Sequence, residues 1–198
     1  MKSLYRFIVK PLSDRYDNTK RVGDKDLILN TNVENHSFIS KRALVVAVPI
    51  NFTTSVKIGD EVLIHHNIFR RWYDMKGKEK NSASYFKDDL YFCDIGQLYL
   101  HKSNGDYYTN LDYCFIKPLK SEGEDKEKPL TGVVKYSNSY LSRFGVNVGD
   151  IVTFKPESEF EFIVDYERLY CMKLNDIVIK HEYEGNEEEY NPSWANSS

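Results

Sequence analysis

The sequence has 198 residues, of which 41% are hydrophobic and 29% are charged, and its formal net charge is −3. This composition excludes an intrinsically disordered chain, and the length fits one large domain or two small ones. The small net charge gives no overall attraction to nucleic acid or to an anionic membrane. No apolar run approaches the ~20 residues that span a bilayer, and no secretion signal is evident, so we expect a cytoplasmic protein with no membrane partner.

Three blocks of this sequence occur twice, in the same order. The pairs are residues 7–12 and 115–119 (FIVKPL and FIKPL), residues 43–49 and 130–136, and residues 56–64 and 146–154. Two copies are too few for a solenoid, so the repeats predict two similar small domains. We place them at residues 1–104 and 105–181. An acidic tail, residues 182–198, follows them, and we expect it to be disordered or lightly docked.

The first domain is predicted to be a series of short strands, because its apolar runs are rich in Val, Ile, Tyr and Phe. We expect strands within residues 5–12, 42–49, 56–64, 89–95 and 98–100. Gly59-Asp60 before a β-branched run favours a tight turn with positive φ, and Asn104-Gly105 marks another turn. Residues 68–73 fit a hairpin strand, and residues 76–84 form a solvated loop by composition.

The second domain repeats this pattern with almost no helical periodicity. We expect strands within residues 111–119, 130–136, 146–155, 159–164, 168–172 and 174–179. The whole chain is therefore predicted to be all-β and to consist of two small, irregular β-barrels in tandem.

The longest polar segment, residues 13–40, exceeds an ordinary connection, and such loops are usually functional or mobile. One apolar tripeptide interrupts it, Leu27-Ile28-Leu29, between Asp26 and Asn30. It is either a short strand packed on the domain or an exposed adhesive segment that docks into a partner's groove. The second domain has a shorter, purely charged segment at the same place, residues 120–128, without any such tripeptide.

In these features the chain resembles the GroES-type co-chaperonins. That family has an opening strand, a mobile loop with an apolar tripeptide, an apolar strand, a Val-x-Val-Gly-Asp turn with its strand, and a closing strand pair. The resemblance is carried by residues 6–10 (RFIVK), 44–48 (LVVAV), 56–60 (VKIGD), 131–135 (TGVVK), 146–154 (VNVGDIVTF) and 167–179. It covers nearly the whole chain. The Gly-Asp turn is common in barrels, so the specific signal is the order and spacing of four elements, found twice.

The resemblance implies two tandem GroES-like barrels and a non-enzymatic function. The protein would form a homo-oligomeric ring, cap a GroEL-type chaperonin ring and assist ATP-dependent protein folding. Leu27, Ile28 and Leu29 would be the chaperonin-binding residues of the mobile loop, docking into a hydrophobic groove of the chaperonin. Weak binding by each flexible loop would add up around a ring through effective concentration.

The chain departs from the family at several places. The second domain lacks the tripeptide, and the links at residues 50–55 and 137–145 are too short for a roof hairpin, which implies an open or differently capped dome. The first domain is expanded around residues 72–87. The Asn-, Lys-, Tyr- and Ile-rich composition is typical of an AT-rich genome and favours a phage source, which would place the protein in the host cytoplasm. The alternative function is a viral structural or assembly protein that uses the same barrels for subunit contacts.

Other chemistry receives little support from the sequence. The odd number of cysteines, Cys93, Cys114 and Cys171, favours buried free thiols, with a disulfide or redox pair as the alternative. His65 and His66 are adjacent on a predicted strand and should point to opposite faces, so we expect no metal site. There is no Cys-x-x-Cys spacing and no phosphate-binding glycine motif, so we expect neither a cofactor nor an enzyme. The basic and aromatic residues 70–80 favour a solvated hairpin over a grip on single-stranded nucleic acid.

Overall fold

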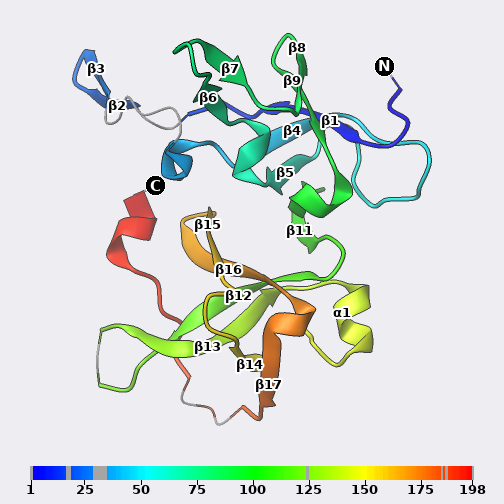
Figure 1. Ribbon diagram of the computed structural model, residues 1–198. Helices are drawn as coiled ribbons and strands as arrows, with labels where there is room; N and C mark the ends of the chain where they lie inside the picture. Colours follow the sequence, from blue (N-terminus) through cyan, green and yellow to red (C-terminus); the bar gives the residue numbers. More distant parts are fainter. Residues whose placement is uncertain are drawn as a thin grey trace. The chain divides into compact units, whose positions relative to one another are not determined.

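A computed structural model describes residues 2–16, 19–28, 35–123, 125–183, 185 and 187–197. It is mostly β, and it divides into two compact units, unit 1 at Met1–Tyr107 and unit 2 at Tyr108–Ser198 (Figure 1). Each unit contains one large antiparallel sheet. The predicted β-rich character is confirmed.

The sheet of unit 1 has seven strands in the order β11-β10-β5-β4-β1-β9-β8. Their bounds are β1 Phe7–Pro11, β4 Arg42–Ala47, β5 Glu61–Ile64, β8 Tyr85–Lys87, β9 Leu90–Cys93, β10 Leu98–Ser103 and β11 Asp106–Thr109. β10 and β11 are joined at Asn104 and Gly105, both with positive φ, which confirms the predicted Asn-Gly turn. The sheet packs its apolar faces around Phe7, Ile64 and Tyr91.

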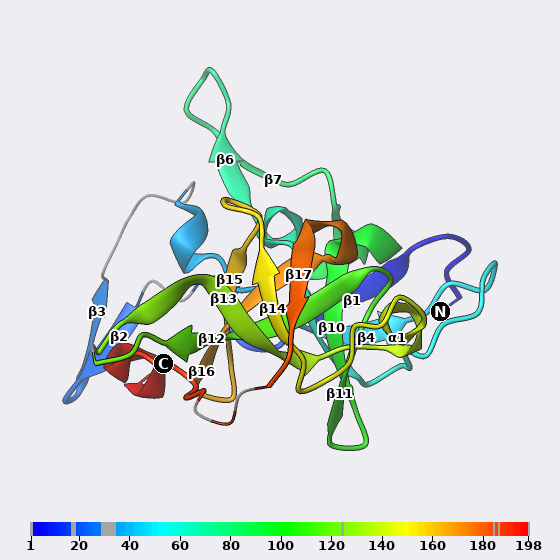
Figure 2. The ribbon, with the colours of Figure 1, turned by 90° about the horizontal axis from the view of Figure 1, so that it is seen from below.

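Two further hairpins belong to unit 1. One consists of β2 (Thr19–Val22) and β3 (Lys25–Ile28), and the other of β6 (Arg71–Tyr73) and β7 (Glu79–Asn81), drawn in teal in Figure 2. Three 3-10 helices complete the unit, η1 at His36–Phe38, η2 at His66–Ile68 and η3 at Ile95–Gln97. The hairpin expected from residue 68 onwards is present, and it also takes up part of the segment predicted to be a solvated loop.

The sheet of unit 2 has six strands in the order β15-β16-β12-β13-β14-β17. Their bounds are β12 Tyr113–Lys120, β13 Glu127–Tyr136, β14 Ile151–Phe154, β15 Phe160–Val164, β16 Glu167–Lys173 and β17 Ile177–His181. The unit also has two 3-10 helices, η4 at Leu174–Asp176 and η5 at Ser193–Ser197. Its core is formed by Cys114, Ile116, Val152 and their neighbours.

The two sheets have the same topology. Read from the opposite end, β17-β14-β13-β12-β16-β15 corresponds to β10-β5-β4-β1-β9-β8, and η4 corresponds to η3. The first strand of each unit even carries the same irregularity, a register shift between Ile8 and Val9 in unit 1 and between Phe115 and Ile116 in unit 2. A bulge at one matched point of the ladder is a specific feature. The internal duplication inferred from the sequence is thus visible in the fold.

The repeated Gly-Asp turn has the same geometry in both units. Gly59 and Gly149 have φ values of +92° and +90°, as the sequence predicted, because glycine takes this conformation without steric strain. The Gly59 N–H donates to Val45 O at 2.9 Å, and the Gly149 N–H donates to Val134 O at 2.8 Å. The following aspartate accepts from the backbone N–H three residues earlier, at 2.8 Å for Asp60 and 2.7 Å for Asp150. The turn therefore fixes the entry to β5 and to β14.

Neither sheet closes into a barrel through hydrogen bonds between its described strands. Within the described residues, no ladder joins β8 to β11 in unit 1 or β15 to β17 in unit 2. Both sheets thus have edge strands. The structure confirms two antiparallel sheets of the same topology, and it does not show the predicted closed barrels among the described residues. None of the helices among the described residues has the length and the apolar content that crossing a membrane requires.

Two parts of unit 2 differ from a plain series of strands. The link before β14 contains the one short α-helix of the described residues, α1 (Ser139–Arg143), which begins where the Asn138 side chain accepts from the N–H groups of Tyr140 and Leu141. Five residues are too few to show a helical period, so this helix could not be predicted from the sequence. The acidic tail also pairs with β12, through a bridge between Glu189 and Leu119.

The three cysteines are free and buried in the two cores. Burial raises the pKa of each thiol, to about 12 for Cys114, because a thiolate cannot be solvated there. We expect the folded protein to react with Ellman's reagent at a rate set by unfolding, and three thiols to react at once in denaturant. Fast reaction of any thiol in the folded protein would contradict this burial.

Candidate functional site

The long segment between β1 and β4 leaves unit 1 from a fixed stem. Tyr16 and Ile39 form an antiparallel bridge, and the Ser40 N–H donates to Arg15 O at 2.9 Å. Tyr16 and Ile39 are both buried, so the two sides of the stem are held by the core as well as by backbone hydrogen bonds. The chain between them is therefore presented by a rigid base.

Side chains from elsewhere in unit 1 hold this stem. The Tyr16 hydroxyl accepts from the Arg71 N–H at 2.8 Å, and the Arg71 guanidinium lies 4.5 Å from the Tyr16 ring centre. Arg15 donates to Phe69 O at 2.8 Å and to Asn81 Oδ1 at 2.9 Å. Arg71 and Asn81 of the hairpin β6–β7 thus contribute three of the contacts that fix the stem. Support of this stem is therefore one role of the expanded region around residues 72–87, to which the sequence pattern assigned no role.

Part of the segment beyond the stem is itself a hairpin. β2 and β3 pair antiparallel from Thr19–Ile28 to Val22–Lys25, around a turn in which Gly23 has a φ of +63°. Leu27 lies in β3 opposite Lys20, and its side chain is 55% exposed. The backbone of Ile28 ends the strand, and Leu29 lies outside the described residues. The tripeptide therefore begins on a strand, and its first side chain faces solvent.

Unit 2 has nothing comparable at the matching place. Its first two strands, β12 and β13, are joined by a short turn in which the Ser121 N–H donates to Lys126 O at 2.9 Å and the Ser121 hydroxyl donates to Glu127 O at 3.0 Å. The loop between the first two strands therefore differs in length between two units of equal topology.

A cluster of three histidines lies near the base of the long segment. The His65 and His66 rings stack with their centres 4.3 Å apart, and His36 of η1 lies 5.4 Å from His66. The expectation that His65 and His66 point to opposite faces is wrong, because β5 ends at Ile64 and the backbone turns into η2 there. Within the described residues, no group of three or more His, Cys, Asp or Glu side chains is arranged to hold a metal ion.

This cluster predicts a stability that depends on pH. Burial, followed by the charges of His65 and His36, lowers the pKa of His66 from 6.5 to about 4. Between those values the unfolded chain binds a proton that the folded chain does not, so stability falls as the pH drops from 6.5 towards 4. Since His66 is only half-buried, we expect a loss on the order of 1 kcal/mol after discounting for solvent screening.

The measurement is urea unfolding at pH 7 and at pH 5, for the unchanged protein and for His66→Gln. The variant should lose less stability than the unchanged protein over this interval, because it has no group to protonate at that position. An equal loss in both proteins would assign the pH dependence to other groups.

The tail covers the outer edge of β12 in unit 2. Glu189 forms an antiparallel bridge with Leu119, the Lys120 N–H donates to Glu188 O at 2.7 Å, and the Tyr190 N–H donates to Pro118 O at 2.8 Å. Residues 188–190 thus add a short strand segment to β12 beyond the point where β16 stops pairing with it.

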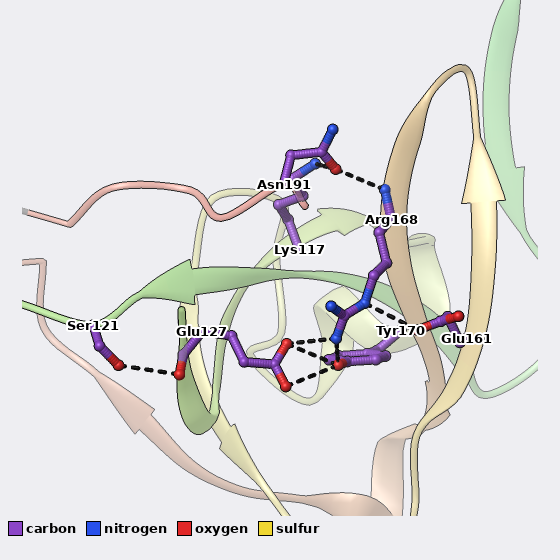
Figure 3. A network of polar contacts seen from close by, with 7 residues as sticks. All are labelled: Lys117, Ser121, Glu127, Glu161, Arg168, Tyr170 and Asn191. Atoms are coloured by element: carbon purple, nitrogen blue, oxygen red, sulfur yellow. Dashed lines mark hydrogen bonds and ion pairs between the residues drawn. The ribbon is translucent and has the colours of Figure 1, made fainter. Parts of the chain in front are cut away.

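Side chains strengthen this contact (Figure 3). The Asn191 side-chain oxygen accepts from Lys117 Nζ at 2.8 Å and from the Arg168 N–H at 2.9 Å. Burial lowers the pKa of Lys117, which is only 2% exposed, although Glu167 lies 3.6 Å away and favours its charge. The guanidinium of Arg168 also pairs with Glu127 at 2.5 Å and with Glu161 at 3.0 Å. Residues 188–191 of the tail are therefore held on unit 2 by backbone and side-chain hydrogen bonds, whereas the sequence predicted a disordered or lightly docked tail.

The basic and aromatic residues of β6–β7 are largely used within unit 1. Arg71 pairs with Glu79 at 2.9 Å, Lys80 lies 3.7 Å from Asp74, and the Trp72 indole N–H donates to Asn81 O at 3.2 Å. Cations that already have acidic partners give little attraction to phosphate groups. The arrangement favours the solvated hairpin over a nucleic-acid site.

Comparison of the sequence with models of known protein families and with curated protein sequences found no match.

Proposed function

We propose that this protein is a lid for a chaperonin: a non-enzymatic, ring-forming co-chaperonin of two tandem GroES-like barrels. The observation that carries the proposal is the segment between β1 and β4, which leaves a stem fixed by Tyr16 and Ile39 and presents the exposed side chain of Leu27. The shared topology of the two sheets and the repeated Gly-Asp turn support the resemblance to that family. Leu27, Ile28 and Leu29 are the proposed anchor.

The energetics of such an anchor are suited to reversible attachment. Fully burying a leucine or isoleucine side chain stabilises a complex by about 1.5–3 kcal/mol, from which the cost of ordering the segment is subtracted. A β2–β3 hairpin that is already paired reduces that ordering cost. One anchor for two units halves the density of anchors around a ring of barrels, so each anchor has to be recognised well for the ring to bind.

The test is capture of the purified protein by a bacterial-type chaperonin with ATP, with ADP and without nucleotide. We expect nucleotide-dependent binding that is lost in the double variant Leu27→Asp/Ile28→Asp. Met75→Asp is the matched control, because Met75 is an exposed apolar residue in the loop of the other hairpin of unit 1. Equal loss in the control would point to general effects of added charge.

The alternative, a viral structural or assembly protein, makes a different prediction in the same experiment. The outer strand β17 exposes Val178 and Ile179, so unit 2 offers an apolar edge for contacts between subunits in either case. If no chaperonin, including that of the native host, captures the unchanged protein, the lid function is wrong. The search would then turn to assembled particles that contain this chain.

A further inference from the structure

The Lys-Pro-Leu motif at the end of the first strand allows a direct comparison of the two units. Because Val9 pairs with Val45 as Ile116 pairs with Val134, residues Lys10, Pro11 and Leu12 correspond to Lys117, Pro118 and Leu119. In unit 2 the tail covers this motif, and Leu119 is only 3% exposed. In unit 1 Lys10 is exposed, and Leu12 is 41% exposed.

The uncovered motif borders an open groove in unit 1. The groove has a volume of about 480 Å³ and is lined by Lys10, Pro11, Ser13, Asp14, Arg15, Tyr16, Arg71 and Asp89. Asp89 stands at the position of Arg168 in unit 2, because Val9 pairs with Tyr91 as Ile116 pairs with Tyr170. The groove of unit 1 is thus the counterpart of the place where the tail lies in unit 2.

Backbone groups along this groove are ready to pair with a further strand. The tail bonds to Pro118 O and to the Lys120 N–H, whose counterparts are Pro11 O and the Ser13 N–H. The Ser13 N–H donates to no acceptor among the described residues. A carbonyl oxygen of an incoming segment would satisfy this donor.

We propose that this groove of unit 1 binds an extended segment of a partner protein, which adds to β1 as the tail adds to β12. The segment would pair with Pro11 O and the Ser13 N–H, and it would carry an asparagine whose side-chain oxygen accepts from Lys10, as Asn191 accepts from Lys117. The chain directly beyond β10 does not fill the groove, because it folds back as β11 and pairs with β10, three strands away from β1.

The side chain that faces the docked segment differs between the units, and this difference indicates which kind of residue the segment carries. In unit 2 the tail residue Glu189 pairs with Lys135 at 3.6 Å. The matched position in unit 1 is Val46, which is half-buried, since Val45 corresponds to Val134. A segment with an apolar residue at the place of Glu189 therefore suits unit 1 better than the tail of a second copy, which would place a carboxylate beside a valine.

The experiment uses two fluorescein-labelled peptides of residues 187–194, one with the native sequence and one with Glu189→Val, titrated with the full chain by fluorescence anisotropy. We expect the valine peptide to bind more tightly. Lys10→Glu and Ser13→Pro should each weaken it ~10-fold, because one charge-assisted or backbone hydrogen bond is lost. Lys57→Glu, at an exposed lysine in the Gly-Asp turn, is the matched control and should bind normally. Circular dichroism and the fluorescence of the two tryptophans, Trp72 and Trp194, check that Ser13→Pro is folded.

Each other outcome overturns the inference. If the valine peptide shows no saturable binding, the groove is not a docking site. If Lys10→Glu and Ser13→Pro leave its affinity unchanged, the peptide binds elsewhere, for example by displacing the tail from unit 2. If the native peptide binds more tightly than the valine peptide, the occupant is a second copy of this chain. None of these results depends on whether the protein binds a chaperonin.

Discussion

Gly132→Ala should destabilise unit 2 by about 2–4 kcal/mol, a large effect for a single methyl group. A Cβ atom at Gly132 would lie 2.4 Å from Ile116 Cγ2 and 2.5 Å from the Lys117 backbone oxygen. The isoleucine side chain has some freedom to move, but the oxygen belongs to the paired strand β12, so the β12–β13 ladder itself has to shift. Backbone shifts in a packed sheet are among the costly responses to added volume.

Urea unfolding followed by Trp194 fluorescence measures this loss, in a Trp72→Phe background that leaves one tryptophan in the chain. Gly96→Ala is the matched control, because a Cβ atom added at Gly96 would meet no atom within 4 Å and Gly96 has no positive φ. The control, followed by circular dichroism, should be neutral or slightly stabilising. A Gly132→Ala variant as stable as the control would show that β12 and β13 do not approach this closely.

Ending the chain after residue 187 should destabilise unit 2 by ~2 kcal/mol, the second-largest effect. The change uncovers Leu119, whose full burial is worth about 1.5–3 kcal/mol, and removes several hydrogen bonds of about 0.5–1.5 kcal/mol each. The release of Lys117 into water and the freedom gained by the tail offset part of this sum. Hydrogen exchange should become faster at the N–H of Lys120, which loses its acceptor, Glu188 O.

The control is a chain that ends after residue 195. It keeps the bridge at Leu119 and the contacts of Asn191, so its stability and its exchange at Lys120 should match those of the full chain. If the two truncated chains were equally stable, the tail would lie on β12 without stabilising it.

The parts of this fold that the sequence predicted are those with local signals. Gly59-Asp60 and its repeat require a positive φ that glycine adopts easily, so the turns and the strands after them were found at the right places. The duplication was found because the same local signals recur in the same order. The strand order and the matched bulge could not be derived, since they depend on which strands pair.

The missed features depend on short elements or on distant partners. The β2–β3 hairpin has a Gly-Asp pair at Gly23, the same turn signal as elsewhere, but its flanking residues are too polar to show a strand pattern. Asn191 and Lys117 are 74 residues apart, and no local sequence pattern near either residue predicts that they form a hydrogen bond. The anchor is a prediction from apolar residues within a polar segment, whereas the fixed stem at Tyr16 and Ile39 required the structure.

The proline of the Lys-Pro-Leu motif also bears on aggregation. β1 pairs with β9 only as far as Val9, so the end of β1 leaves an open edge that would ordinarily invite pairing with any extended chain, including a misfolded copy. Pro11 has no N–H to offer and Lys10 adds a charge, so an approaching strand finds only a short stretch of usable backbone groups. Such an edge rejects long, regular strands and keeps its affinity for brief segments. Replacing Pro11 with valine would supply the missing N–H and remove this protection against unwanted strand pairing.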